Sequence, residues 1–281
     1  MNGEDAVECL ACGGAQAMTF AAVNGITLVR CMECGHLFQK VYPGFEESQV
    51  DFLGERAPGD RQLDPVAALR EFRFPERQSA EDAFRLIRSS AARGSVLDVG
   101  CGRGCLLLIL RQHGWDDAVG IEPSPGADYG RERYGLDIHR GFVEDVDLGD
   151  RLFDVAVSMQ CIEHTPRPLE FLRAIHDRTR PGGVAILTLP NAFSPHSRVK
   201  NFLSRAGLKR RPWRHLGLPK HISQFSVGSF RQLVDRSGFL VVRHGSLISP
   251  HVQSDWLRVA KRAAALVVPT NNMFWVLARP S

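Results

Sequence analysis

The sequence lacks any apolar run long enough to cross a membrane, and no apolar stretch follows basic residues near its N-terminus. Such runs mark membrane spans and secretory leaders, so we expect a soluble, cytoplasmic chain without a membrane span. The sequence also lacks a strong charge excess, because 35 Lys and Arg face 31 Asp and Glu and leave a formal net charge of +4. This mildly basic balance permits contact with nucleic acid but does not argue for it. Internal repeats and low-complexity tracts are absent as well.

Cysteine is scarce, but four of the seven cysteines form two close C-x2-C pairs with 18 residues between the pairs. They are Cys9, Cys12, Cys31 and Cys34. Each pair turns two thiolates toward one ion, and two pairs complete a closed tetrahedral zinc site. Disulfides are disfavoured because no secretion signal is seen, and redox-active thiols are a further alternative. We therefore predict a zinc ribbon with a structural Zn²⁺ over residues 1–40, in which a β-hairpin turns at Asn24-Gly25.

The most informative segment, residues 96–104, reads VLDVGCGRG, an apolar strand that leads into a glycine-rich turn. Its glycines are Gly100, Gly102 and Gly104, which let the backbone approach a ligand closely because no Cβ is in the way. The segment has neither the Lys-Ser/Thr of a P-loop nor the spacing of a dinucleotide site. Asp98 would repel a pyrophosphate but suits an ammonium group, and Glu122, which ends the next apolar run, can accept hydrogen bonds from ribose hydroxyls. The pattern favours S-adenosylmethionine as the ligand.

Around this segment, strand and helix patterns alternate, which is typical of an α/β fold with a mostly parallel sheet and helices on both faces. The expected strands are residues 95–99, 118–122, 137–139, 153–158, 184–189, 240–244 and 273–278. The expected helices are residues 79–92, 105–113, 126–134, 169–178 and 227–237. We divide the chain into the ribbon (1–40), a linker with short helical pieces (41–78) and the main domain (79–281), in which residues 192–225 form an insert on the acceptor side.

Further motifs follow in the order and spacing of the class I S-adenosylmethionine-dependent methyltransferases. They are Phe153-Asp154, Ile162-Glu163-His164, Arg180-Pro181-Gly182-Gly183, Leu189-Pro190-Asn191, the segment 219–226 and Ser237-Gly238-Phe239. The chain resembles in particular the methyltransferases of small molecules and glycans, many of which carry a cysteine-rich module that ends in Cys-Gly-x-x-Phe, here Cys34 to Phe38. The resemblance implies a Rossmann-like sheet of seven strands, mostly parallel, whose last strand is antiparallel.

The resemblance also implies where the cofactor lies. Asp98 and the glycines are expected to hold the methionine moiety, and Glu122 the ribose. The adenine is expected near the segment that holds Phe142, Val143 and Glu144. Many relatives have an acidic residue where this chain has Phe142, so we expect Phe142 to stack on the adenine and its acidic neighbours to share the contact. Gln160 is expected to line the cofactor pocket.

Catalysis of methyl transfer rests mainly on alignment and the exclusion of water, because the reaction is an in-line displacement. An acceptor can also need its proton removed, and histidine is the usual base near neutral pH. His164 follows a strand at the carboxyl edge of the sheet and is the first candidate, with a capping or pocket-shaping role as the alternative. His221 is the weaker candidate, because contact with the substrate from a loop is the simpler interpretation.

A second metal is a further hypothesis for this region. Some relatives bind a divalent metal near the acceptor through a Glu-x-x-Glu-His run and a distant histidine. Here the run is Gln160-x-x-Glu163-His164, with His221 downstream. Because Gln160 removes one anionic ligand for a hard cation, we expect no metal there.

The acceptor is the open question. We favour O- or C-methylation of a small molecule or sugar, with the basic insert either forming a solvated lid or holding an anionic group. The alternative is methylation of a ribosomal RNA base, in which the zinc module and the insert would grip RNA. Against it, the insert shows no interleaving of aromatic and basic residues. A non-enzymatic zinc-ribbon protein is a third hypothesis, which the intact Asp98, glycines and Glu122 disfavour.

Overall fold

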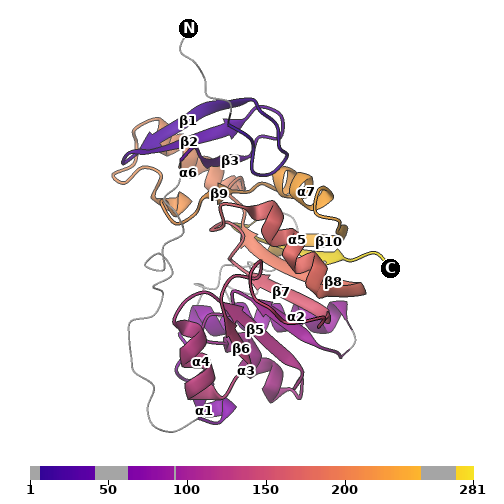
Figure 1. Cartoon of the computed structure of the whole chain (residues 1–281). Helices are drawn as coiled ribbons and strands as arrows, with labels where there is room; N and C mark the ends of the chain where they lie inside the picture. Colours follow the sequence, from indigo (N-terminus) through magenta and orange to yellow (C-terminus); the bar gives the residue numbers. More distant parts are fainter. Residues whose placement is uncertain (1–6, 42–62, 92, 248–269) are drawn as a thin grey trace.

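A seven-stranded β-sheet forms the centre of the protein, which we describe from a computed structural model covering residues 7–41, 63–91, 93–247 and 270–281 (Figure 1). Its strands are β4 (Val96–Val99), β5 (Ala118–Glu122), β6 (Ile138–Arg140), β7 (Phe153–Met159), β8 (Thr179–Pro190), β10 (Leu240–Leu247) and β11 (Asn272–Ala278). They lie in the order β6-β5-β4-β7-β8-β11-β10. The strands from β4 to β8 pair in parallel, whereas β11 is antiparallel to both of its neighbours. The expected mostly parallel sheet with an antiparallel last strand is confirmed.

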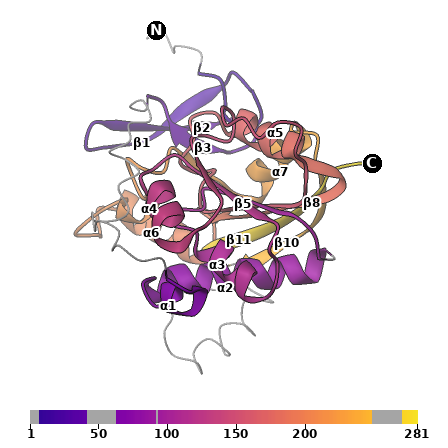
Figure 2. The ribbon, with the colours of Figure 1, turned by 60° about the horizontal axis from the view of Figure 1, so that its bottom comes forward.

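Helices cover both faces of this sheet. They are α1 (Pro65–Leu69), α2 (Phe74–Ser90), α3 (Cys105–Gln112), α4 (Gly126–Tyr134), α5 (Pro168–Arg178), α6 (Pro195–Arg205) and α7 (Val227–Asp235). Side chains alternate along each strand, so Val96 belongs to one hydrophobic core with α1, α2 and α3, and Leu97 to the other with α5 and α7. Figure 2 shows these two groups of helices on opposite sides of the sheet. No helix of the described residues is long and apolar enough to cross a membrane.

Several element boundaries differ from the sequence-based expectation, most of all at the starts of β8 and α2. Strand β8 begins at Thr179 and not at residue 184. Helix α2 begins at Phe74 and not at residue 79, because Pro75 suits a first helical turn and the Glu76 carboxylate accepts a hydrogen bond from the Arg73 N–H (2.8 Å). Part of the predicted linker is therefore helical, and its residues 42–62 lie outside the described residues. Helix α6 was not expected within the insert. Ser194 caps it by accepting from the Ser197 N–H (3.2 Å).

A second, smaller sheet belongs to the N-terminal cysteine module, and Cys31 ends one of its strands. It consists of β1 (Ala17–Val23), β2 (Ile26–Cys31), β3 (Leu37–Gln39) and β9 (Ser223–Gln224), in that order. The hairpin between β1 and β2 turns at Asn24-Gly25 as expected, with positive φ at both residues. The last strand, β9, comes from the insert and not from the N-terminal module. The sequence did not predict this pairing, which joins the N-terminal module to the insert (Figure 1).

Candidate functional site

The candidate site lies where the strand order of the parallel sheet reverses, between β4 and β7. From β4 the chain proceeds outward through β5 to β6 and then returns to β7, on the other side of β4. Such a switch point leaves a crevice at the carboxyl ends of the strands, where ligands bind in open α/β sheets. Asp98, Glu122 and Gln160 all stand at these strand ends.

Asp98 is fully buried, and neither of its carboxyl oxygens has a hydrogen-bond partner among the described residues. Burial, and then the nearby Glu122, raise the pKa of Asp98 to about 8. An unpartnered buried carboxyl group is costly. A cationic group of a ligand would offset that cost, so Asp98 fits the ammonium of S-adenosylmethionine.

The three glycines of the turn have positive φ but differ in what surrounds them. A Cβ on Gly100 would lie 2.2 Å from Cys161 Sγ, and one on Gly104 would lie 2.4 Å from Leu136 Cδ1. A Cβ on Gly102 would meet open space. Gly100 and Gly104 therefore serve close packing, whereas Gly102 leaves room beside the backbone for a ligand.

Glu122 connects the end of β5 to the glycine turn. Its carboxylate accepts hydrogen bonds from the backbone N–H groups of Gly102 and Ser124, both at 2.9 Å. Each carboxylate oxygen has further lone pairs, so the same group can also accept from two hydroxyls. The structure thus brings Asp98, Gly102 and Glu122 together, as the sequence predicted for a nucleoside site.

The segment expected near the adenine follows β6. Phe142 is 39% exposed, which leaves its ring accessible for stacking, whereas Val143 is buried in the core. Burial raises the pKa of Glu144, and its Oε2 atom has no hydrogen-bond partner among the described residues. The side chain of Val143 is therefore not available to a ligand. The role of this segment stays a prediction.

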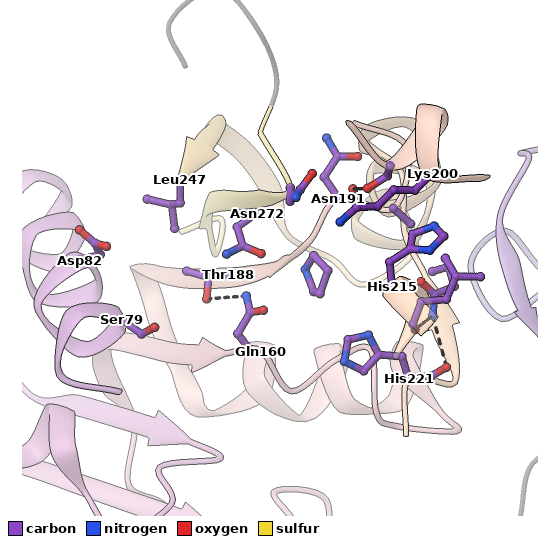
Figure 3. A pocket seen from close by; sticks show the side chains of 16 residues that line it. Ser79, Asp82, Gln160, Thr188, Asn191, Lys200, His215, His221, Leu247 and Asn272 are labelled. Carbon is purple, nitrogen blue, oxygen red and sulfur yellow. Dashed lines mark hydrogen bonds between the residues drawn. The ribbon is translucent and has the colours of Figure 1, made fainter. Parts of the chain in front are cut away.

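A cavity of about 350 Å³ lies beside the end of β7 (Figure 3). Most of its lining side chains carry amide, hydroxyl or imidazole groups. They are Ser79, Gln160, Thr188, Asn191, Ser197, His215, His221, Gln224, Asn271 and Asn272, and the charged Asp82 and Lys200 also line the cavity. Gln160 adopts positive φ and its side chain amide donates to Thr188 Oγ1 (3.4 Å). Sequence reasoning missed most of this lining because it comes from α2, β8, the insert and β11, which no local pattern links.

The two candidate histidines lie together, with ring centroids 4.8 Å apart in an edge-to-face arrangement. His221 lines the cavity, and His164 is not among the described residues that do so. Burial, and then the nearby His164, lower the pKa of His221 to about 4. The Nδ1 atom of His164 donates to the Lys220 carbonyl (3.0 Å), which leaves its Nε2 as the proton-accepting nitrogen. Burial also lowers the pKa of His164.

Glu163 stands beside these histidines, with its Oε1 4.0 Å from His164 Nε2. It is 1% exposed, and neither oxygen has a hydrogen-bond partner among the described residues. Burial raises its pKa to about 8. Glu163, His164 and His221 offer ligand atoms within 4.8 Å of one another.

The comparison with known protein families identifies the fold that carries this site. Residues 69–244 match the family described as a methyltransferase domain. The chain belongs to this family. Its membership of the class I S-adenosylmethionine-dependent methyltransferases, expected from the sequence, is thereby confirmed. The matched residues do not include the N-terminal cysteines.

Curated relatives of this methyltransferase domain are named ubiquinone biosynthesis O-methyltransferases. The one from Ruegeria pomeroyi is 30% identical over 158 residues, which are 52% of this chain and 62% of the relative. The one from Azorhizobium caulinodans is 34% identical over 103 residues, which are 34% of this chain and 40% of the relative. The chain thus spans less than two thirds of the length of either relative.

Solved structures share the fold of the methyltransferase domain. A chain from the complex of the Haloferax volcanii Trm112 methyltransferase activator with a methyltransferase gives a TM-score of 0.56 at 16% identity, covering 79% of this chain and all of that chain. An S-adenosylmethionine-dependent methyltransferase from Mesorhizobium loti gives 0.52 at 18% identity, covering 72% of this chain and 98% of that chain. Both confirm the Rossmann-like α/β architecture.

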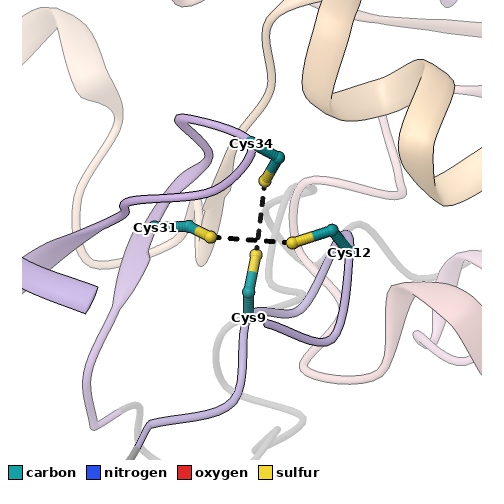
Figure 4. A group of neighbouring side chains, drawn as sticks. All are labelled: Cys9, Cys12, Cys31 and Cys34. Carbon is teal, nitrogen blue, oxygen red and sulfur yellow. Dashed lines mark hydrogen bonds between the residues drawn. The ribbon is translucent and has the colours of Figure 1, made fainter. Parts of the chain in front are cut away.

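Ahead of the methyltransferase domain, the four N-terminal cysteines converge on one point (Figure 4). The Sγ atoms of Cys9 and Cys34 lie 3.6 Å apart, as do those of Cys12 and Cys31. Four thiolates at about 2.3 Å from a tetrahedral zinc ion are about 3.8 Å from one another. A hydrogen bond from Cys34 lowers the pKa of Cys9 to about 5. The arrangement therefore fits a closed tetrahedral metal site of the kind that the spacing predicted.

Proposed function

We propose that this protein transfers the methyl group of S-adenosylmethionine to a hydroxyl or an acidic carbon of a small polar molecule or sugar. One observation carries the proposal: three residues meet at the switch point of the sheet. The Asp98 carboxyl group has no hydrogen-bond partner among the described residues, Gly102 has open space beside its backbone, and the Glu122 carboxylate can accept further hydrogen bonds. We assign the ammonium group to Asp98, the ribose to Glu122 and the adenine to the segment 142–144. Bound there, the cofactor supplies an electrophilic methyl group.

The acceptor enters the cavity beside Gln160 in this proposal. A cavity of about 350 Å³ suits a molecule of one or two rings, and its amide and hydroxyl lining suits hydroxyl-rich ligands better than apolar ones. The names of the curated relatives favour transfer to oxygen over transfer to carbon. Lys200, which lines the same cavity, can pair with an anionic group on the acceptor.

His221 is the better candidate for the general base, ahead of His164. It lines the cavity, so its imidazole can reach a bound acceptor, whereas His164 is not among the described residues that line it. His164 contacts the His221 ring and is held by the Lys220 carbonyl, so we assign it the role of orienting His221. The four cysteines hold a structural Zn²⁺ in this proposal.

Methylation of an RNA base is a second candidate, which the charge of the insert favours. Residues 192–225, all of which the structure describes, contain eight Arg and Lys and no Asp or Glu. Of these eight cations, Lys200 alone lines the cavity. RNA held by the others would bind less tightly as salt rises, in proportion to the phosphates contacted.

Cofactor binding is tested by calorimetry with S-adenosylhomocysteine on the Gly102→Ala and Gly149→Ala variants. Both glycines have positive φ, +56° and +57°, and an added Cβ meets open space at each. The backbone strain is therefore matched at about 1 kcal/mol. We expect Gly102→Ala to weaken binding by about tenfold or more, because its Cβ occupies ligand space, and Gly149→Ala to bind as the wild type does. Equal affinity in both variants, or no binding to the wild type, would refute the cofactor assignment.

The acceptor class is tested by transfer of a labelled methyl group to sugar nucleotides, phenols and a ribosomal RNA transcript. Transfer to a sugar or phenol that changes little between about 50 and 200 mM salt supports the first candidate. Transfer to RNA alone, lost steeply over that range, supports the second and overturns the first.

A further inference from the structure

The cysteine module, residues 7–41, contacts the stretch of the insert that borders the cavity. We call this stretch, residues 217–224, the cavity loop, because His221 and Gln224 line the cavity. Strand β3 of the module pairs with β9 at the end of the loop. Just beyond the pair, the backbone N–H of Gln39 donates to the carbonyl of Ile222 (3.0 Å). The backbone hydrogen bonds between the module and the cavity loop therefore continue beyond β9 to residue 222.

The buried side chain of Gln39 reaches further into the cavity loop. Its Nε2 donates to the Pro219 carbonyl (2.5 Å) and to the His221 carbonyl (3.1 Å). From inside the loop, the Gln224 amide donates to the carbonyls of Leu216 (2.7 Å) and His221 (3.4 Å). The carbonyl of His221 is thus held from two sides, and one of the two donors belongs to the cysteine module.

A second set of contacts ties the same loop to the turn after β7. His36, fully buried in the module, stacks on Phe225 with ring centroids 4.6 Å apart, and its Nε2 lies 3.3 Å from Ser223 Oγ. The Ser223 N–H donates to the carbonyl of Glu163 (3.0 Å). The cavity loop therefore lies between the module on one side and the Glu163-His164 turn on the other.

We propose that the cysteine module is a positioning element for the acceptor cavity, and that Gln39 is the residue through which it holds His221 in place. The inference rests on the proposed function, because it takes the cavity as the acceptor site. Within the loop, the His221 N–H donates to the Gly217 carbonyl (3.1 Å), which closes one turn of backbone. Loss of the Gln39 amide leaves two partly buried carbonyls without that donor, and such groups shift to regain partners. Because the four cysteines and Gln39 belong to the same small module, we expect metal binding at the cysteines to affect the geometry of the cavity.

The test compares Gln39→Leu, which removes the donor at similar side-chain volume, with Thr19→Ala, an exposed position of the same module. Amide hydrogen exchange of residues 217–224, read by mass spectrometry, reports the loop, and the rate of His221 modification by diethylpyrocarbonate reports its imidazole. We expect both rates to rise about fivefold or more in Gln39→Leu, with exchange over β4 and α3 unchanged and Thr19→Ala as the wild type. Chelation of the metal from the wild type is expected to raise the same two rates.

Unchanged rates in a folded Gln39→Leu variant would overturn the proposal. An equal rise over the whole chain would also overturn it, because that reports general destabilisation. Should Gln39→Leu not fold, Gln39→Asn, which keeps the donor on a shorter arm, is expected to raise the two rates by a smaller factor. Neither readout needs an acceptor, and calorimetry of the wild type with S-adenosylhomocysteine reports the cofactor site separately. Failure of the proposed function is thereby distinguished from failure of the positioning role.

Discussion

Asp98 and Glu163 are buried at the same edge of the sheet, and neither carboxyl group has a hydrogen-bond partner among the described residues. Burial raises the pKa of each to about 8, because a carboxylate without hydrogen bonds is poorly tolerated away from water. Such groups lower stability unless they are protonated or meet a cation. At the scale of single residues, the site is therefore recognised by what the fold leaves unpaired.

Cofactor binding is expected to release a proton from Asp98 near neutral pH. With a pKa of about 8, Asp98 is mostly protonated at pH 7, and the ammonium group of S-adenosylhomocysteine favours its ionised form. Affinity is therefore expected to rise with pH up to about 8, by at most about tenfold per pH unit. Calorimetry in buffers of different ionisation enthalpy measures the proton. Asp98→Asn removes the release, and the same release in that variant would contradict the assignment.

At the scale of elements, the two-residue strand β9 has a larger consequence than its length suggests. It brings the insert into the sheet of the cysteine module, and Phe38 of that module belongs to the same core as Phe225 and Phe230. The Arg236 side chain, after α7, also donates to the Ala11 carbonyl (2.8 Å). The module is thus packed onto the methyltransferase domain at several points.

The cysteine module is expected to bind one zinc ion per chain. Cys31→Ser removes one of four ligands and is expected to lower the zinc content to well under half, with a loss of stability, because structural zinc contributes directly to folding. Elemental analysis and thermal unfolding measure the two effects. Cys105→Ser is the matched control, since Cys105 is buried in a different core. Full zinc content in Cys31→Ser would rule out the four-cysteine site.

At the scale of the whole molecule, buried groups of opposite kinds make stability depend on pH. The folded-state pKa of Asp98 and Glu163, about 8, lies above the unfolded value of about 4, so their contribution is complete below pH 4 and is lost as pH rises to 8. His215 and His221 have a folded-state pKa of about 4, below the unfolded value of about 6.5. Their contribution is complete above pH 6.5 and is lost as pH falls to 4.

These effects oppose each other below pH 6.5, and of these four groups only the two carboxyl groups act above it. The free energy of unfolding of the ligand-free protein is therefore expected to fall between pH 6.5 and 8, by at most about 1.4 kcal/mol per pH unit and group. Urea unfolding at several pH values measures the slope. The double variant Asp98→Asn, Glu163→Gln is expected to flatten it, whereas Asp145→Asn, at an exposed position, is not. An equal slope in all three proteins would contradict this account.

The local elements were well predicted where periodicity and turn residues agree. The expected helix 126–134 and strand 118–122 have the observed bounds of α4 and β5, because Gly135 ends the helix in the left-handed conformation and Glu122 ends a short buried run. The start of α2 was placed five residues late, since a Pro-Glu pair at the first turn was read as part of the linker. Helix α6 was missed because its basic residues read as a solvated lid.

The residues at strand ends could be assigned from the sequence because each lies next to its own motif. Asp98, Gly102 and Glu122 meet wherever consecutive βα units form a parallel sheet, so their proximity follows from local pattern and general topology. The cavity is different. Ser79 comes from α2, Asn191 from the end of β8 and Asn272 from the start of β11, and their meeting depends on how distant segments pack.

The chain's own order of residues thus specified the α/β domain, the nucleoside-type turn and the four-cysteine cluster, because each depends on contacts between residues close in sequence or in successive elements. Packing in three dimensions specified the choice of His221 over His164 at the cavity wall and the seating of the cysteine module on the insert. Both depend on contacts between residues tens to nearly two hundred positions apart, such as His36 with Ser223. Such contacts are made by burial and hydrogen bonding in the folded state, and no periodicity or spacing along the chain records them.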